Sequence, residues 1–179
     1  MSDKKAQTRE RILQAASAAL VQRGPAEPSV GEVMGAAGLT VGGFYAHFES
    51  KDALMLEAFS QLLAQRRASI DDMDAQLTGE ERRALVAAFY LSRKHRDSTA
   101  KACPIPATVG EMGRLPDAFR DVLNEHVELM AAQLAASPED TDKALADMAL
   151  MVGGLALARA LGPGELSDRV LRAAKSAIR

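Results

Sequence analysis

The 179-residue sequence is long enough for one domain, or for a small domain joined to a larger one. Apolar residues make up 47% of it and aromatic residues only 4%, and strand-forming residues are scarce beside abundant alanine. We therefore expect an all-α protein with a core of Ala, Leu and Met. The net charge of −2 by itself argues against nucleic-acid binding. Residues 1–23, however, carry five basic and two acidic residues, an excess of three positive charges.

What the sequence lacks excludes several classes of protein. The one cysteine, Cys103, cannot form an internal disulfide, and no Cys/His spacing fits a metal site. No catalytic constellation or glycine-rich phosphate loop is present, so we expect neither an enzyme nor a cofactor. The N-terminus has no signal-peptide pattern, and the longest apolar stretch, residues 148–158, is too short to span a bilayer. We therefore expect a soluble cytoplasmic protein with no membrane partner.

The first predicted helix covers about residues 8–23 and ends at Gly24. Ser29 and Glu32 then form a capping box, Ser-x-x-Glu, in front of a short second helix. We expect this second helix to stop at Gly38, because glycine adopts the left-handed conformation without a Cβ clash. These signals predict a short helix that runs directly into a tight turn.

The next helix is predicted to begin at Thr40, whose side chain can cap it. Phe44 and Phe48 are four residues apart and share the inward face of this helix. Tyr45 must point about 100° away from Phe44, toward the outside. Two short helices joined by a Gly-containing turn, with the second exposing an outward face, predict a helix-turn-helix.

The outer face of this helix-turn-helix has two unusual features. Gly42 and Gly43 lie in the first turn of the second helix, where glycine lets a backbone approach another molecule closely. Lys51 follows Ser50, the expected cap of the next helix, and a lysine beside a helix N-terminus suits a phosphate. Each feature has an ordinary alternative, since glycines are tolerated near helix starts and Lys51 can simply be solvated. Together, within a helix-turn-helix, they favour DNA.

Residues 37–54, Ala-Gly-Leu-Thr-Val-Gly-Gly-Phe-Tyr-Ala-His-Phe-Glu-Ser-Lys-Asp-Ala-Leu, resemble the signature of the TetR family. The resemblance extends back through residues 8–16 and covers about residues 7–60. It implies an N-terminal three-helix helix-turn-helix head, residues 1–50, that binds DNA. This head is joined to a helical-bundle body, residues 51–179, that binds an effector and dimerises. We therefore expect a ligand-responsive transcriptional regulator, specifically a repressor that binds a palindromic operator on double-stranded DNA as a homodimer.

The expected DNA contacts follow from the outward positions of the head and from this resemblance. Tyr45 should reach a phosphate or a thymine methyl group, and Lys51 should neutralise a phosphate. His47 lies on the same predicted helix and can meet a phosphate or a base. The full set of expected DNA-binding residues is Ser29, Thr40, Val41, Gly42, Gly43, Tyr45, His47 and Lys51.

The body is expected to be helical throughout. A second capping box, Thr78 to Glu81, should open a helix with an apolar stripe of Leu85, Ala88, Phe89 and Leu91. We interpret the basic residues 93–101 as a solvated helix end or loop, with His95 among them. His126 is expected to be a partly buried structural residue. The remaining helices are predicted at about residues 52–72, 107–112, 117–136, 138–161 and 166–178.

The helix expected at residues 138–161 is apolar on nearly every side from residue 144 onward, which predicts burial on nearly every side. Gly153, Gly154 and neighbouring alanines leave little bulk between helices. This helix and the one at residues 117–136, taken from two subunits, can therefore form a four-helix interface. The family resemblance implies the same homodimer.

The resemblance also implies a small-molecule cavity in the body. An apolar or amphipathic effector fits the candidate lining best, although core packing is the ordinary alternative for each residue. The candidate ligand-binding residues are Phe89, Tyr90, Cys103, Met112, Phe119 and Met130.

A function from another class stays open beside the regulator. The chain could be a helical dimeric sensor or interaction protein without operator binding, responsive to oxidation through Cys103. This cysteine precedes Pro104 at an expected helix start and lies close to Lys101, and both features lower a thiol pKa. A buried, inert thiol is the alternative.

Overall fold

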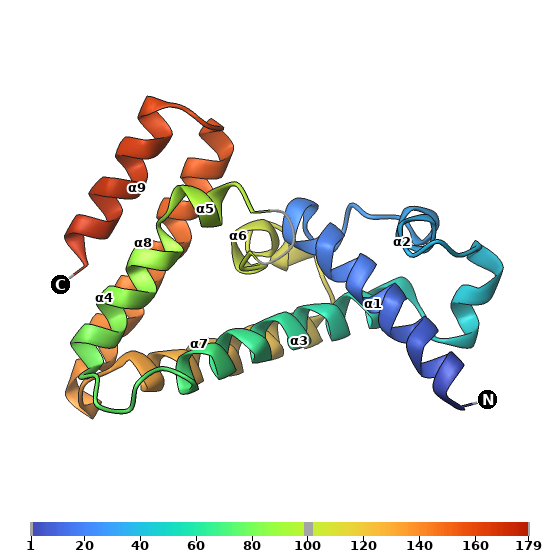
Figure 1. Ribbon diagram of the computed structural model, residues 1–179, viewed down its shortest axis with the longest axis horizontal. Coiled ribbons are helices and arrows are strands. Elements are labelled where there is room, and N and C mark those ends of the chain that lie inside the picture. The colour runs from blue at the N-terminus through green and yellow to red at the C-terminus, as the bar shows by residue number, and fades with distance from the viewer. Residues whose placement is uncertain (1, 99–101, 179) are drawn as a thin grey trace. The chain divides into compact units, whose positions relative to one another are not determined.

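The computed structural model describes residues 2–98 and 102–178, and every regular element in these ranges is a helix (Figure 1). This confirms the predicted all-α class. The chain divides into two compact units, Met1–Leu63 with Thr99–Val122 (unit 1) and Ala64–Ser98 with Leu123–Arg179 (unit 2). The predicted functional division after residue 50 stays a prediction. The elements of the chain are α1 (Ser2–Arg23), α2 (Val30–Ala36), the 3-10 helix η1 (Val41–Ala46), α3 (Lys51–Asp71), α4 (Gly79–Tyr90), α5 (Arg93–Arg96), α6 (Ile105–Thr108), η2 (Met112–Arg114), α7 (Asp117–Leu134), η3 (Pro138–Asp140), α8 (Thr141–Leu161) and α9 (Glu165–Ala177).

Unit 1 is built around α1, which packs against α2 and α6. α1 begins at Ser2, earlier than the predicted start near residue 8. It ends as predicted at Gly24, which has a φ of +79° and donates its N–H to the carbonyl of Leu20 at 2.9 Å. The fully buried Ile12, Leu13 and Leu20 form the inner side of α1. Burial of this side fixes α1 within unit 1.

α3 begins at the predicted cap, because Ser50 Oγ accepts a hydrogen bond from the Ala53 N–H at 3.0 Å. One side of α3 is buried through Leu54, Met55, Ala58, Phe59 and Leu63. Phe59 packs against Phe119 with ring centroids 5.8 Å apart. Phe119 is therefore a core residue of unit 1.

The core of unit 2 comes from helices that are distant in sequence. α8 and α9 pack most closely, and a Cβ placed on Gly154 would lie 2.9 Å from the Cβ of Ala174 and 3.1 Å from Leu91. Only a residue without a side chain fits this close approach. The buried residues of this core are Ile70, Ala87, Leu91, Met130, Ala131, Leu134, Ala144, Met148, Met151, Leu155, Ala158, Leu171 and Ala174.

The predicted apolar stripe of α4 is only partly buried, because Leu91 at its end is buried whereas Leu85, Ala88 and Phe89 are exposed. The capping box of α4 is present, with Thr78 and Glu81 bonded to each other's backbone N–H groups, but Arg83 is buried. Arg83 can be buried because it donates to the Leu134 carbonyl at 2.9 Å and is paired with two carboxylates.

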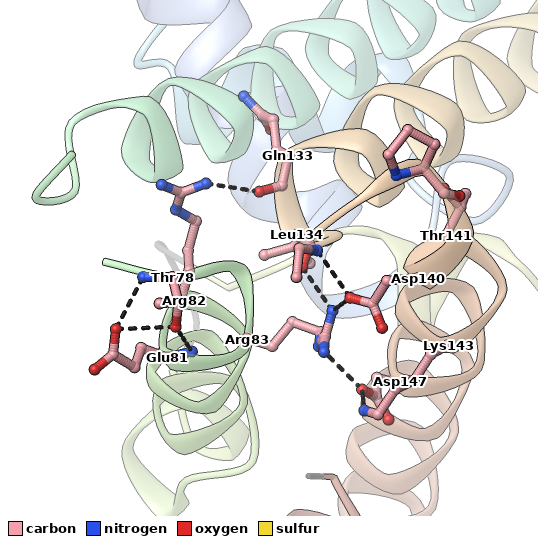
Figure 2. A network of polar contacts seen from close by, with 12 residues as sticks. Thr78, Glu81, Arg82, Arg83, Gln133, Leu134, Asp140, Thr141, Lys143 and Asp147 are labelled. Carbon is pink, nitrogen blue, oxygen red and sulfur yellow. Dashed lines mark hydrogen bonds and ion pairs between the residues drawn. The ribbon is translucent and has the colours of Figure 1, made fainter. Parts of the chain in front are cut away.

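Figure 2 shows the carboxylates that make this burial possible. Asp140 accepts a hydrogen bond from Arg83, and Asp147 lies 3.4 Å from the Arg83 Nε. Lys143 donates to the same Asp147 oxygen at 2.7 Å. The network connects α4 to the end of α7 and the beginning of α8, so ion pairing outweighs the apolar pattern in fixing the rotation of α4.

The basic stretch at residues 93–98 is not a solvated loop, which corrects a second expectation. α5 forms there, with His95 and Arg96 buried. Arg96 pairs with Asp97 at 2.7 Å and with Asp168 of α9 at 2.9 Å, which compensates its charge. Lys101, which belonged to the same predicted loop, lies outside the described residues.

α8 is not buried on every side within one chain. Leu157 and Leu161, which are four residues apart, are exposed on one face of it, and Leu145 is exposed as well. By length and composition alone, residues 138–161 form a helix long and apolar enough to cross a membrane. This helix is longer than the apolar run of residues 148–158, and 39% of its most apolar part is buried inside the protein. The helix is a core element of unit 2 that leaves one apolar face uncovered.

Candidate nucleic-acid interface

The turn of the helix-turn-helix is closed by a Schellman motif. Gly38 has a φ of +68° and donates its N–H to the carbonyl of Gly35 at 2.9 Å. The Leu39 N–H donates to the carbonyl of Met34 at the same distance. These two bonds satisfy the last carbonyls of α2, and only glycine adopts the required conformation without strain. The turn is therefore fixed by its own backbone.

The second element of the motif is a 3-10 helix, η1, and not the predicted α-helix. Thr40 occupies its N-cap position but makes no side-chain capping bond, which also corrects the prediction. The Gly43 N–H instead donates to the Thr40 backbone carbonyl at 3.2 Å. The two glycines in this first turn make a regular α-helix unfavourable.

The inward and outward positions of η1 are those the sequence predicts. Phe44 is fully buried, and Phe48 stacks on it with ring centroids 6.0 Å apart. Tyr45 is 74% exposed and Val41 is 50% exposed. The tyrosine hydroxyl therefore projects from a rigidly packed element.

Gly42 and Gly43 lie on the open side of η1. A Cβ on Gly42 would meet nothing within 4 Å, and one on Gly43 would meet only the Met34 terminal methyl at 4.0 Å. Packing within this chain does not require glycine at either position. Because neither position carries a side chain, the outer face of η1 has a low profile there, meaning that its backbone is open to close approach.

Two predicted contact residues already have partners. The Ser29 hydroxyl caps α2 through the Glu32 N–H at 3.2 Å, and Glu32 also accepts a bond from Arg23 at 2.9 Å. The Ser29 backbone N–H, together with Arg23, lowers the pKa of Glu32 to about 2. Lys51 donates to the Ala26 carbonyl at 2.6 Å. An ammonium group carries three donors, so this bond leaves Lys51 able to meet a phosphate.

A basic pocket lies beside η1 and was not predicted as a unit. It has a volume of about 430 Å³ and is lined by Lys4, Lys5, Thr8, Ala46 and His47. The buried His47 Nδ1 has no hydrogen-bond partner among the described residues. The sequence showed the excess of positive charge at the N-terminus, but only the fold places these lysines next to His47.

The predicted ligand-binding residues are divided between the two units. Cys103, Met112 and Phe119 belong to unit 1, where Cys103 and Phe119 are buried. Phe89, Tyr90 and Met130 belong to unit 2, where Met130 lies in the core and Phe89 is 48% exposed. The ligand-binding roles of all six stay predictions, and Lys101, the expected neighbour of Cys103, is outside the described residues.

His126 of unit 2 is buried and lies against Arg67. His126 Nδ1 is 3.0 Å from the Arg67 guanidinium, and burial together with Arg67 lowers the pKa of His126 to about 4. Because arginine is always the donor, this ring nitrogen is the acceptor. His126 is more fully buried than predicted, and its structural role is supported by this bond.

Comparison with known proteins gives two matching family models. Residues 12–58 match the model of bacterial regulatory proteins of the tetR family, and residues 79–174 match the model of the tetracyclin repressor-like C-terminal domain. The second match alone covers more than half of the chain. The chain belongs to the TetR family.

One curated relative is similar in sequence, and two solved structures have a similar fold. An uncharacterized HTH-type transcriptional regulator, YerO of Bacillus subtilis, is 25% identical over 161 residues, covering 87% of this chain and 54% of YerO. The chain thus spans about half the length of that curated relative. The reduced form of Escherichia coli NemR has a TM-score of 0.81 at 19% identity, with 97% of this chain and 95% of NemR covered. A TetR-family regulator from Agrobacterium tumefaciens has a TM-score of 0.80 at 19% identity, with 97% and 98% covered.

The matching family model describes bacterial regulatory proteins, and the chain has the fold of the transcriptional regulators of this family. Its helix-turn-helix could be found from sequence because glycine, capping and aromatic positions recur at fixed spacing. The Lys4–Lys5–His47 pocket could not, because its parts are about forty residues apart and only the packing of α1 near the end of η1 brings them together.

Proposed function

We propose that this protein is a cytoplasmic, ligand-responsive repressor that binds a palindromic operator as a homodimer and releases it on binding a small molecule. The observation that carries the proposal is the outer face of η1, where the exposed Tyr45 lies on an element anchored by the buried Phe44. Family membership supports DNA binding by a dimer and a response to small molecules as general properties. The operator sequence, repression as the direction of regulation, and the identity of the effector are specific to this chain.

DNA recognition would combine two kinds of contact. Tyr45 and the low-profile Gly42 and Gly43 would approach the major groove, while Lys4 and Lys5 would contact phosphates of the backbone. The His47 ring borders the same basic pocket and would lie beside the phosphates that these lysines contact. Phosphate contacts set affinity and salt dependence, and contacts to base edges set sequence preference.

The exposed face of α8 supports dimerisation. Leu157 is 52% exposed and Leu161 is 44% exposed, one turn apart, and Leu166 at the start of α9 is 56% exposed. Neighbouring exposed leucines, such as Leu157 and Leu161, are a feature of protein–protein contacts. A dimer formed through this face would present two heads to two half-sites.

A mobility-shift titration of the DNA flanking the protein's own gene tests the proposal. The wild type should shift one fragment at nanomolar to micromolar concentration in low salt, and unlabelled fragment should compete better than unrelated DNA. A small-molecule panel should contain a compound that reverses the shift. Binding that is equal for every fragment would contradict operator recognition and favour the alternative of a sensor or interaction protein without an operator.

A further inference from the structure

The position of η1 depends on side-chain packing more than on local helix preference. Its first turn contains two glycines, and its N-cap residue Thr40 makes no side-chain capping bond. At its C-terminal end the Phe44 carbonyl accepts hydrogen bonds from the N–H groups of His47 and Phe48, at 2.9 Å and 3.1 Å. A 3-10 helix of six residues with such weak local preferences needs tertiary contacts to hold one orientation.

An arginine of α1 packs on the aromatic residues that anchor η1. The Arg9 guanidinium lies over the Phe48 ring, 4.5 Å from its centre. Phe48 stacks on Phe44, and Phe44 meets the Tyr45 ring edge-on with centroids 5.2 Å apart. A guanidinium is attracted to the face of an aromatic ring by its charge and by its planar shape. Arg9 therefore begins a continuous series of contacts that ends at the exposed Tyr45.

A carboxylate of α3 fixes this guanidinium. Arg9 donates two hydrogen bonds to Glu57, from Nη1 to Oε1 at 2.6 Å and from Nη2 to Oε2 at 2.5 Å. This paired geometry holds the guanidinium plane in one orientation, whereas a lysine would make only a point contact. α1 precedes the helix-turn-helix and α3 follows it, so the ion pair joins the two helices on either side of the motif in sequence.

The ion pair is too exposed for its main effect to be on stability. The side chains of Arg9 and Glu57 are 40% and 37% exposed, and pairs with this exposure contribute little to folding. Glu57 also compensates the charge of Arg9, so the pair adds little to the positive field that attracts phosphates. Its structural consequence is geometric, because it places a planar group against Phe48.

We propose that Arg9 is a positioning residue for DNA recognition, held by Glu57 and acting through Phe48 and Phe44 on the orientation of Tyr45. Arg9 does not contact DNA itself. This inference rests on the proposed function, in which the outer face of η1 reads the operator, and deepens it by assigning a supporting residue to that face. Direct neutralisation of a phosphate by Arg9 is the alternative, and the two roles give different results when lysine replaces arginine.

Mobility-shift titrations of Arg9→Lys across a salt series test this role, with the gene-flanking fragment and unrelated DNA side by side. Lysine keeps the charge but loses the paired bonds and the planar contact. Affinity for the gene-flanking fragment should fall roughly fivefold, binding to unrelated DNA should stay within about twofold of the wild type, and the salt slope should not change. Wild-type affinity for the fragment, or an equal loss on both DNAs, would overturn the inference.

A double-mutant cycle shows whether Arg9 acts through the aromatic pair. In a Phe48→Leu background, which keeps an apolar side chain without a ring, Arg9→Lys should cause no further loss of affinity for the fragment. An undiminished loss would contradict the path through Phe48. Arg120→Lys is the matched control, because Arg120 of α7 pairs with Asp117 at 2.8 Å, and it should alter binding to neither DNA. Thermal melts establish that each variant is folded at the assay temperature.

A measurement without DNA separates this inference from the proposed function. The sequence has two tyrosines and no tryptophan, so Tyr90→Phe leaves Tyr45 as the one tyrosine reporter. In this background Arg9→Lys should enlarge the subnanosecond loss of tyrosine fluorescence anisotropy roughly twofold, because the Tyr45 ring is less constrained.

The two measurements together distinguish the possible failures. If the anisotropy changes as expected but the wild type binds no gene-flanking DNA selectively, the positioning of Tyr45 by Arg9 stands and the proposed repressor does not. If the wild type binds the fragment selectively while Arg9→Lys changes neither the anisotropy nor the affinity, the repressor stands and the positioning role does not.

Discussion

Phe44 and Tyr45 are neighbours in the chain whose rings lie nearly perpendicular, at 86°, with centroids 5.2 Å apart. The first ring is fully buried and the second is 74% exposed. One residue thus anchors η1 to the core while the next presents a ring and a hydroxyl to the outside. Because one ring is buried and the other is exposed, the two positions can be tested independently.

The variants Tyr45→Ala and Phe44→Ala should therefore have opposite effects. Tyr45→Ala should weaken DNA binding and leave the melting temperature within a degree or two, because the exposed ring contributes little to the core. Phe44→Ala should lower the free energy of unfolding by about 3–5 kcal/mol. Operator affinity and a thermal melt, measured on the same preparations, check both. Unfolding of Tyr45→Ala would show that the outer face of η1 is misassigned.

The basic pocket beside η1 predicts a change in salt dependence. Lys4→Ala or Lys5→Ala should weaken binding to all DNA sequences alike. Each change should also reduce the slope of log affinity against log salt by about one, because one phosphate is no longer neutralised by the protein. The exposed Lys175 of α9 offers a matched control, and Lys175→Ala should leave the slope unchanged. Equal slopes in all three variants would remove the pocket from the DNA interface.

Substitution by glutamate should have different effects at two leucines of α8. Leu157→Glu should convert the dimer to a folded monomer, because this side chain is 52% exposed within one chain. Leu155 is fully buried, so Leu155→Glu should unfold the protein instead of dissociating it. Sedimentation equilibrium should give twice the 19.0 kDa chain mass for the wild type and the single mass for Leu157→Glu. A wild-type monomer would contradict dimerisation.

The buried histidines predict that stability falls in mild acid. The pKa values of His95 and His126 are lowered to about 4 from the ordinary 6.5, so the unfolded chain binds protons that the folded chain does not. Their contribution is fully present above pH 6.5 and is lost as the pH falls from 6.5 toward 4. His126→Gln, which keeps an acceptor for Arg67, should flatten this part of the urea-unfolding profile. An unchanged profile would mean that His126 is accessible to protons in the folded state.

Burial of Cys103 predicts slow thiol chemistry in the folded protein. The side chain is only 2% exposed, so a thiol reagent should modify it mainly after denaturation. Release of DNA by peroxide from the wild type, but not from Cys103→Ser, would instead establish the thiol-responsive alternative. Equal behaviour of the two proteins would leave Cys103 as a buried core residue.

The sequence predicted those parts of the fold that depend on local chemistry. The capping boxes of Ser29 and Thr78, the left-handed Gly24 and Gly38, and the opposed faces of η1 follow from short-range rules of backbone geometry. These features are confirmed because each is decided within a few residues of the chain.

The remainder depends on contacts between distant residues. The rotation of α4 is set by the ion pairs of Arg83 with Asp140 and Asp147, some sixty residues away, and no apolar periodicity reveals them. α5 is ordered in the same way by Asp168 of α9. Charged residues placed in the core by distant partners cannot be located by a hydrophobic pattern.

A hydroxyl-radical footprint of the DNA flanking the gene, with the wild type and Tyr45→Ala side by side, tests the central claim most directly. The wild type should protect two dyad-related patches separated by about one helical turn, 10–10.5 base pairs, or a multiple of it. Tyr45→Ala, although folded and dimeric, should lose that protection at the same protein concentration. A single unpaired patch, or the same footprint from both proteins, would contradict recognition by a dimer through the outer face of η1.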